Sequence, residues 1–273
     1  MKRFIYFLKE GYKVSLLLFC CAALMIQTMT FAQSPPGLYA RVTMLKAAEG
    51  KEKEFENFVK QRVKPLQVIR QQSGEMAFWI FFRVHFAGQA DDYNYVGVGY
   101  YPSWANTEQE TLGELLKQSD GDADVAEFTR LQRELRTVVR ESIFYQLEAV
   151  EPNPPVPARY VMIGYMKAKP GKQSDYLNIE RNEWIPVHQR LLTEGQSAGW
   201  GLWQVVFPGG TGSTYDYVTS NRYSTYDQVL QVNYEAMFKK VRPGANVTDI
   251  LNRTTASRDL VRSELWEVVE MVN

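Results

Sequence analysis

The sequence predicts an α+β protein in which one unit of four strands and two helical regions occurs twice. Two observations lead to this fold class. The second half of the chain repeats the first at a nearly constant spacing, and within each half the hydrophobic pattern alternates between strand and helix periods. A proline-rich stretch at 151–158 separates the halves, and its composition favours an extended linker.

The internal repeat is visible position by position. An offset of 121 relates identical residues at several places, namely Lys46, Ala47, Gly50, Lys51, Pro65, Gly74 and Trp79. After a one-residue insertion an offset of 122 relates Tyr93, Tyr95, Val96 and Tyr101 to Tyr215, Tyr217, Val218 and Tyr223. Matches held at two constant offsets over about a hundred residues indicate an internal duplication.

Each copy opens with a strand rich in β-branched and aromatic residues, at 39–47 and 160–168. An amphipathic helix follows, with a proline (Pro65, Pro186) that we expect to kink or break it and a glycine (Gly74, Gly195) that stops it. Two strands come next, at 77–86 and 94–101, or 198–207 and 215–223. A second helical region, interrupted near 119–122 in the first copy, leads to a last strand at 142–150 or 264–271.

The resulting order, β-α-β-β-α-β in each copy, is that of the ferredoxin-like split unit. A four-stranded sheet with helices on one face leaves its other face uncovered, and a second copy can cover it. We therefore expect two tandem ferredoxin-like β-α-β-β-α-β repeats, at 38–150 and 159–273, packed sheet to sheet as a pseudo-symmetric α/β barrel.

Residues 1–32 have the pattern of a signal peptide. Basic residues precede the apolar run 14–26, and a small residue, Ala32, stands before Gln33. We expect an exported protein, periplasmic or extracellular. Acylation at Cys20 or Cys21 is an alternative, although the residues before them are not the small ones such processing prefers. A retained membrane anchor is another, for which the apolar run is short.

Charge and cysteine content exclude several classes of function. The chain has 31 Lys and Arg and 31 Asp and Glu, so it shows no electrostatic footprint for nucleic acid or an anionic membrane. Removal of the signal peptide would take both cysteines, which leaves no disulfide and no thiolate for nucleophilic or metal chemistry. We expect no metal site, no cofactor, no nucleic-acid partner and no membrane contact after cleavage.

The stretch 207–213, FPGGTGS, is similar at first sight to a phosphate-binding loop. Such a loop needs a helix N-terminus directly after it, whereas 215–219 has the pattern of a strand. The matching segment of the first copy, 87–92, also joins two strands. We therefore expect a hairpin turn, in which glycine permits the backbone conformation.

Histidine is scarce, since the chain has only His85 and His188. On a helix, Glu180, Trp184 and His188 fall on roughly one face because they are four residues apart. A carboxylate and an imidazole beside an aromatic wall could perform acid/base catalysis or bind a metal, and the alternative is a hydrogen-bonded histidine at the edge of the core. The matching residues of the first copy are Val59, Val63 and Gln67. Such a site would therefore exist in the second copy alone.

A second set of candidates lies on the central strands. Arg83 and His85 share one side of their strand with Trp79, and they could orient an anionic ligand or simply reach water. Aromatic rings on these strands could line a pocket for a flat or apolar ligand, or pack the sheet against the helices. The candidate ligand-binding residues are Trp79, Arg83, His85, Trp184, Trp200, Trp203 and Tyr217.

Two such units packed sheet to sheet resemble the dimeric α/β-barrel superfamily, whose members include antibiotic biosynthesis monooxygenases, NIPSNAP-like proteins and haem-binding chlorite dismutases. More narrowly, the chain is similar to a group of secreted bacterial proteins of unassigned function at Glu180, 184–188, 199–200, 207–210 and 215–219. The haem of the chlorite dismutase branch would rest here on His188 alone, so we expect none.

Three functions remain open. The first is a secreted protein, non-catalytic or weakly catalytic, that binds a small apolar or aromatic molecule between sheet and helices. The second, implied by the resemblance to the monooxygenases, is a cofactor-independent oxygenase or isomerase acting on an aromatic substrate. In it Glu180 and His188 would be the acid/base pair, while Trp184 and Trp200 held the substrate. The third is self-association through exposed edges or faces.

Overall fold

The structure is a computed structural model that describes residues 37–108, 112–120, 125–153 and 156–273. These residues belong to one compact unit, Pro36–Asn273. The expected signal peptide at 1–32, with both cysteines, and residues 154–155 of the expected linker lie outside the described residues. Within the described part, no helix combines the length and the apolar character that a membrane span requires.

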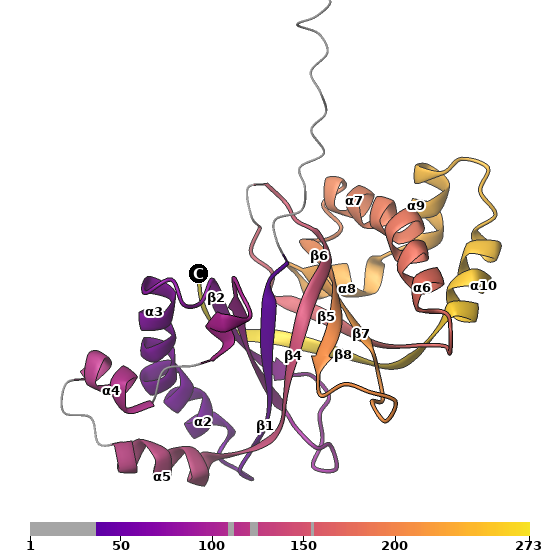
Figure 1. Cartoon of the computed structure of the whole chain (residues 1–273). Coiled ribbons are helices and arrows are strands. Elements are labelled where there is room, and N and C mark those ends of the chain that lie inside the picture. The colour runs from indigo at the N-terminus through magenta and orange to yellow at the C-terminus, as the bar shows by residue number, and fades with distance from the viewer. Residues whose placement is uncertain (1–36, 109–111, 121–124, 154–155) are drawn as a thin grey trace, which may run out of the picture. The chain divides into compact units, whose positions relative to one another are not determined.

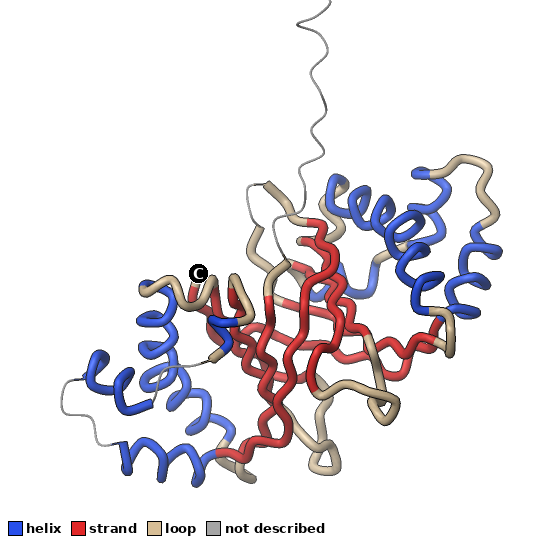
Figure 2. Tube along the Cα trace, in the orientation of Figure 1, coloured by secondary structure: helices blue, strands red, loops and turns tan. Residues whose placement is uncertain are grey.

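Eight antiparallel strands form a closed barrel in the order β1-β3-β2-β8-β5-β7-β6-β4, with one group of helices for each repeat (Figures 1 and 2). Repeat one comprises β1 (Tyr39–Ala47), α2 (Glu52–Phe58), η1 (Val59–Val63), α3 (Lys64–Gln72), β2 (Phe78–Val84), β3 (Tyr95–Tyr101), η2 (Ala105–Thr107), α4 (Leu112–Asp120), α5 (Val125–Leu135) and β4 (Arg136–Val150). Repeat two comprises β5 (Tyr160–Ala168), α6 (Gln173–Ile179), η3 (Glu180–Trp184), α7 (Ile185–Thr193), β6 (Gly199–Phe207), β7 (Tyr217–Tyr223), α8 (Tyr226–Gln231), α9 (Tyr234–Val241), α10 (Val247–Ser257) and β8 (Arg258–Val272).

The last strand of each repeat joins the two repeats. β4 pairs with β1 of its own repeat and with β6 of the other, and β8 pairs in the same way with β5 and β2. The registers correspond, because Val150 is opposite Trp200 and Val272 is opposite Trp79. The predicted pair of repeats and the pseudo-symmetric barrel are therefore confirmed. Closure pairs every strand on both sides, so the described sheet has no free edge, and the expectation of self-association through edges is corrected.

Alternating side chains give the barrel an inner and an outer face. Both repeats contribute to one hydrophobic cluster inside, which includes Val42, Val96, Ile163 and Val218. The outer face of repeat one packs against its helices through a second cluster, and that of repeat two through two smaller clusters. Each repeat therefore has a layer between sheet and helices that is separate from the barrel interior.

Each proline-containing helix continues through a π-helical turn. η1 and η3 lie directly before α3 and α7, which begin with Pro65 and Pro186 in their first turns. Proline removes one N–H donor and crowds the preceding turn, and a wider turn accommodates it without ending the helix. The expected kink or break is thus a change of helical type, at the same place in both repeats. Gly74 and Gly195 end the helices with φ angles of 76° and 68°, as predicted.

The largest departure from the predicted elements concerns the last strands. β4 and β8 begin at Arg136 and Arg258, well before the predicted starts at Ser142 and Glu264. Their first residues are mostly exposed, so no alternation marks them in the sequence, and pairing with β1 and β5 imposes the extended conformation. The interruption expected near 119–122 falls between α4 and α5, where residues 121–124 are not described.

The glycine-rich loop after β6 is a hairpin connection. β6 and β7 pair antiparallel with Gln204 opposite Tyr217, so the chain continues from the loop into a strand. The predicted hairpin is confirmed, and the helix N-terminus that a phosphate-binding loop needs does not follow it.

Candidate functional site

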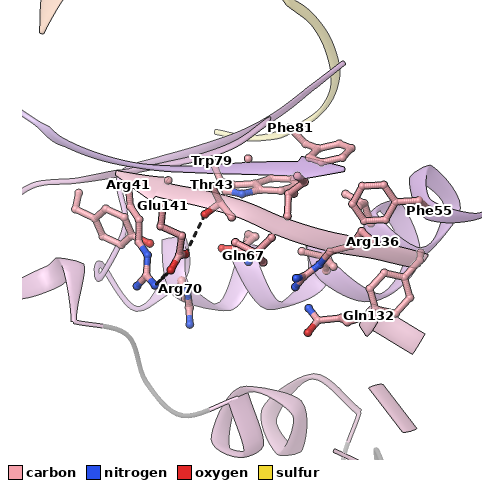
Figure 3. A pocket seen from close by; sticks show the side chains of 18 residues that line it. Arg41, Thr43, Phe55, Gln67, Arg70, Trp79, Phe81, Gln132, Arg136 and Glu141 are labelled. Atoms are coloured by element: carbon pink, nitrogen blue, oxygen red, sulfur yellow. Dashed lines mark hydrogen bonds and ion pairs between the residues drawn. The ribbon is translucent and has the colours of Figure 1, made fainter. Parts of the chain in front are cut away.

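Repeat one has a partly open cavity of about 220 Å³ between its sheet and its helices (Figure 3). Strands β1 to β4 supply one wall, and α2, η1, α3 and α5 supply the other. The lining residues are Arg41, Thr43, Leu45, Phe55, Phe58, Val59, Val63, Gln67, Arg70, Trp79, Phe81, Gly97, Gly99, Tyr101, Gln132, Arg136, Val138 and Glu141. The cavity thus combines aromatic and aliphatic walls with three arginines and a carboxylate.

Buried aromatic rings make part of the wall rigid. Phe55 packs edge-on against Phe81 with ring centroids 5.6 Å apart, and Trp79 stacks parallel to Phe81 at 6.1 Å. An engineered apolar cavity of about 150 Å³ binds benzene, and pockets for drug-sized ligands begin near about 300 Å³. The cavity of repeat one therefore suits a molecule of one or two rings.

Glu141 is held by three hydrogen bonds at the cavity. Arg41 Nη2 donates to its two carboxylate oxygens at 3.1 and 3.3 Å, and Thr43 Oγ1 donates to Oε1 at 3.2 Å. Arg70 is buried, and its Nε lies 3.7 Å from Glu75 Oε1, too far for a hydrogen bond. Arg41 and Glu141 form an ion pair. The carboxylate of Glu75 lies close enough to Arg70 to offset part of its charge.

Arg136 differs from these arginines. Its side chain extends into the cavity from the start of β4 (Figure 3). Burial lowers the pKa of its guanidinium, and the carboxylate of Glu141 opposes that shift. Glu141 is already bonded to Arg41 and Thr43, and within the described part of the chain the Arg136 side chain forms no hydrogen bond or ion pair. An arginine stays protonated, so the cavity contains a cation without a bonded counter-ion among the described residues.

Small residues keep the cavity open on the side of the sheet. A Cβ atom at Gly97 would meet Trp79 Nε1 at 3.9 Å, which is ordinary contact, so a side chain there would enter free space. At Gly99 a Cβ atom would lie 2.8 Å from the Tyr101 hydroxyl, so that position has no room unless the ring moves. Gly97 is therefore the position from which the cavity can be filled.

Repeat two has larger side chains at the matching positions, where Glu180, Trp184 and His188 stand in place of Val59, Val63 and Gln67. The His188 ring stacks on Trp200 with centroids 4.7 Å apart and on Trp184 at 6.2 Å. Trp184 also packs edge-on against Phe238 at 5.0 Å. The structure thus brings together Glu180, Trp184, His188 and Trp200, as side chains that occupy the layer between sheet and helices.

Burial sets the protonation of the two titratable groups in this layer. Glu180 and His188 are 3% and 5% exposed. Burial raises the pKa of Glu180 to about 7, against the opposing charge of Arg258, and lowers the pKa of His188 to about 3. Among the described residues Glu180 and His188 form no hydrogen bond with each other. Tyr234 is near both side chains. His188 is a neutral imidazole at physiological pH, and Glu180 titrates near neutrality.

The alternation of β6 separates two tryptophans that we expected at one pocket. Trp200 faces the helices of repeat two, as does Tyr217 of β7. Trp203 belongs to the barrel interior, where its Nε1 donates to Ser220 Oγ at 3.2 Å. Because Trp200 and Trp203 are an odd number of residues apart, their side chains leave opposite faces of the strand. The placement of Trp203 between sheet and helices is therefore corrected.

Arg83 and His85 lie at the end of β2 and do not line the cavity. Arg83 Nε donates to Glu56 Oε1 at 3.0 Å, and His85 Nε2 lies 3.0 Å from Glu267 Oε2. Both side chains are partly exposed and bonded to carboxylates. Of the expected ligand-binding residues, Trp79 is the one that lines the cavity of repeat one.

Gln67, Gly97 and Arg136 line the cavity and were not predicted as site residues. A signal for them exists in the comparison of the two repeats. In the aligned repeats Val63 corresponds to Trp184, and Gly97 corresponds to Thr219. At both positions repeat one has the smaller side chain, in the layer between its sheet and its helices. Small side chains create this cavity, so the sequence indicates it only when the sizes of corresponding side chains in the two repeats are compared.

Solved structures with the same fold extend over nearly the whole described chain. A "putative monooxygenase" from Fusobacterium nucleatum is 10% identical, with a TM-score of 0.53 over 88% of this chain and 95% of its own. Another, from Lactobacillus acidophilus, is 8% identical with a TM-score of 0.53 over 87% and 96%. A mutant chlorite dismutase from Candidatus Nitrospira defluvii is 12% identical, with a TM-score of 0.50 over 86% and 92%.

At these identities the likeness concerns the fold alone, and it confirms the ferredoxin-like α/β-barrel class. No protein-family model matches the chain, and no curated protein does.

The residues present do not fit a haem. No histidine, cysteine or methionine is among the described residues that line the cavity, where Gln67 takes the place of His188, and the lining tyrosine, Tyr101, is buried at 1% exposure in a cavity of about 220 Å³. His188 itself is stacked against Trp184 and Trp200. The described residues also contain no cluster of three or more His, Cys, Asp or Glu side chains that could hold a metal ion.

Proposed function

We propose that this protein binds a small molecule of one or two rings in the cavity of repeat one. The observation that carries the proposal is the difference between the repeats: the same layer holds Trp184 and His188 in repeat two and a cavity of about 220 Å³ in repeat one. The rigid wall formed by Phe55, Trp79 and Phe81 suits a flat ligand, because its rings are already ordered before binding. The solved structures described as putative monooxygenases share this fold.

A cavity-filling variant tests the proposal. We expect indole and 2-naphthol to bind the purified protein in calorimetric or ligand-observed NMR titrations. In Gly97→Val the new side chain enters the cavity, so binding should weaken at least tenfold. Gly212→Val is the matched control, because a Cβ atom at Gly212, in the hairpin loop of repeat two, meets no atom within 4 Å. Equal affinity of the Gly97→Val and Gly212→Val variants would place the ligand elsewhere.

A second candidate function is a cofactor-independent oxygenase or isomerase in repeat two, where a substrate would have to displace the stacked rings of Trp184 and His188 to reach Glu180. The observation that favours it is the buried carboxyl of Glu180, whose pKa of about 7 suits proton transfer near neutral pH. His188, with a pKa of about 3, would act there as a neutral hydrogen-bonding group. Oxygen uptake and isomer formation with aromatic substrates should fall at least a hundredfold in Glu180→Gln. An unchanged rate in His188→Ala would remove the imidazole from the mechanism.

The cellular setting is also a proposal. The signal-like pattern at 1–32 supports export and cleavage before Gln33, and the resemblance at 184–188 and 207–210 supports a place among secreted bacterial proteins related to the NIPSNAP-like branch. Mass spectrometry of the N-terminal peptide from the periplasm and the medium tests cleavage, and an N-terminus at Met1 would refute it. Sedimentation of the same material tests whether the mature chain self-associates.

A further inference from the structure

The charge of Arg136 gives the cavity a chemical preference beyond apolar shape. The other two arginines that line the cavity have carboxylates nearby, Glu141 for Arg41 and Glu75 for Arg70. Arg136 is half-buried, which lowers the pKa of its guanidinium, and no described side chain bonds to it. A partly desolvated charge without a bonded partner gains from a counter-ion, so the cavity favours occupants that supply an anionic group.

In repeat two the matching layer between sheet and helices is filled by side chains of the protein itself. The residue that matches Arg136 is Arg258, and both pair with the last residue of the first strand of their repeat, Ala47 or Ala168. The positive charge of Arg258 acts on the buried carboxyl of Glu180, one turn of helix before the indole ring of Trp184. Repeat two thus places an arginine, a carboxyl group and an aromatic ring in one layer, where the arginine acts on the carboxyl group through its charge and its Nε has no hydrogen-bond partner among the described residues.

Repeat one keeps the arginine, carries on β4 the carboxylate of Glu141, whose charge acts on it, and lacks the indole ring. Valines at 59 and 63 stand where repeat two has the carboxyl group and the indole, and the volume they free is part of the cavity. We propose that the ligand of repeat one is a small aromatic carboxylate whose carboxylate binds Arg136 while its ring packs on the wall that contains Trp79. This inference rests on the proposed ligand-binding function and specifies its ligand class.

The surroundings of Arg136 suit a carboxylate. A guanidinium can donate two parallel hydrogen bonds to one carboxylate, and such charge-assisted bonds are stronger than neutral ones. Gln67 of α3 and Gln132 of α5 also line the cavity, and their amides can donate to a second lone pair. A neutral ligand of the same shape would leave the guanidinium desolvated and unpaired, so the discrimination should be large.

The experiment compares acids with their isosteric amides. Benzoate and indole-3-carboxylate are titrated calorimetrically against benzamide and indole-3-carboxamide at pH 7, where both acids are ionised. We expect the acids to bind at least tenfold more tightly than the amides. In Arg136→Gln the preference should disappear while amide affinity stays within about threefold, and Arg136→Lys should retain part of the preference. Arg133→Gln, at an exposed position of α5, is the matched control and should behave as the wild type.

The outcomes separate the two proposals. Equal affinity of acid and amide for the wild-type protein overturns the carboxylate inference and leaves ring binding intact. An acid preference that survives Arg136→Gln also overturns it, because the anion is then recognised elsewhere. Failure of every ring compound, acid or neutral, to bind refutes the ligand-binding function and this inference with it. If Arg136→Gln does not fold, as judged by circular dichroism, the wild-type comparison and Arg136→Lys decide.

Discussion

Glu180 and His188 are predicted to give opposite pH dependences of stability that cancel in the wild-type protein. Burial raises the pKa of Glu180 from 4.5 to about 7, so between these values the folded state binds more protons than the unfolded state. Its contribution is therefore lost as the pH rises through this window. Burial lowers the pKa of His188 from 6.5 to about 3, so its contribution is lost as the pH falls from 6.5 toward 3.

The magnitude follows from the overlap of the two windows. Each group changes the free energy of unfolding by about 1.4 kcal/mol per pH unit, with opposite signs between pH 4.5 and 6.5. In Glu180→Gln the histidine effect is unmasked, and stability should fall by about 2–3 kcal/mol when the pH is lowered from 6.5 to 4.5. In His188→Phe, which preserves a stacked ring, the carboxyl effect is unmasked, and stability should fall by a similar amount when the pH is raised over the same range.

Urea unfolding at closely spaced pH values measures both profiles. The wild-type protein and the control Glu54→Gln, at an exposed position of α2, should show nearly flat profiles between pH 4.5 and 6.5. For a chain of this size the change in each variant corresponds to about 5–10 °C in Tm. Parallel profiles for the wild type and both variants would show that burial does not shift these two groups as the structure requires.

Three further outcomes are expected for the cavity and its counterpart. Gly97→Val should raise the free energy of unfolding by about 1–3 kcal/mol, because it buries three carbons at about 0.8 kcal/mol each and removes a glycine from a strand, and a lower midpoint in urea would contradict this. Trp184→Val should lower stability by about 2–3 kcal/mol in the same assay, since the rings of His188 and Phe238 lose a neighbour; an unchanged midpoint would show that repeat two relaxes to fill the space. Indole-3-carboxylate at about 100 times its Kd should stabilise the wild type by about 2.7 kcal/mol in thermal unfolding, and an equal shift in Gly97→Val would place the binding site elsewhere.

The fold was predictable because the duplicated sequence contains the same pattern of strands, helices and turns twice. Pro65 with Pro186, Gly74 with Gly195 and the two hairpins each appear at a fixed offset, so a pattern that is ambiguous in one repeat is supported by the other. The starts of β4 and β8 were not predictable. Their first residues are exposed and extended only because β1 and β5 pair with them, and this tertiary effect leaves no periodicity in the sequence.

The location of the cavity was not predictable by the same reasoning. Titratable and aromatic side chains such as Glu180, Trp184 and His188 draw attention to repeat two, where the structure shows that they pack against one another. The cavity of repeat one is made by valines and a glycine, residues whose chemistry signals nothing. Arg136 was hidden too, because it lies in the part of β4 that carries no strand pattern.

The energetics of the two layers explain why they differ. A closed, dry cavity of about 220 Å³ would cost roughly 5 kcal/mol at about 24 cal/mol per Å³, and the cost in repeat one is smaller because its cavity is partly open to solvent and lined in part by charged side chains. Repeat two has no such unfilled space among its described residues, because larger side chains fill its layer. Two of these side chains are the buried carboxyl of Glu180 and the buried imidazole of His188. Repeat one keeps the space together with a partly buried arginine that no described side chain bonds, and a single occupant with a ring and an anionic group would fill the first and pair with the second. A neutral apolar molecule would relieve only the first, and an inorganic anion only the second. The pairing of these two features in one cavity is therefore the strongest structural reason to seek an aromatic carboxylate.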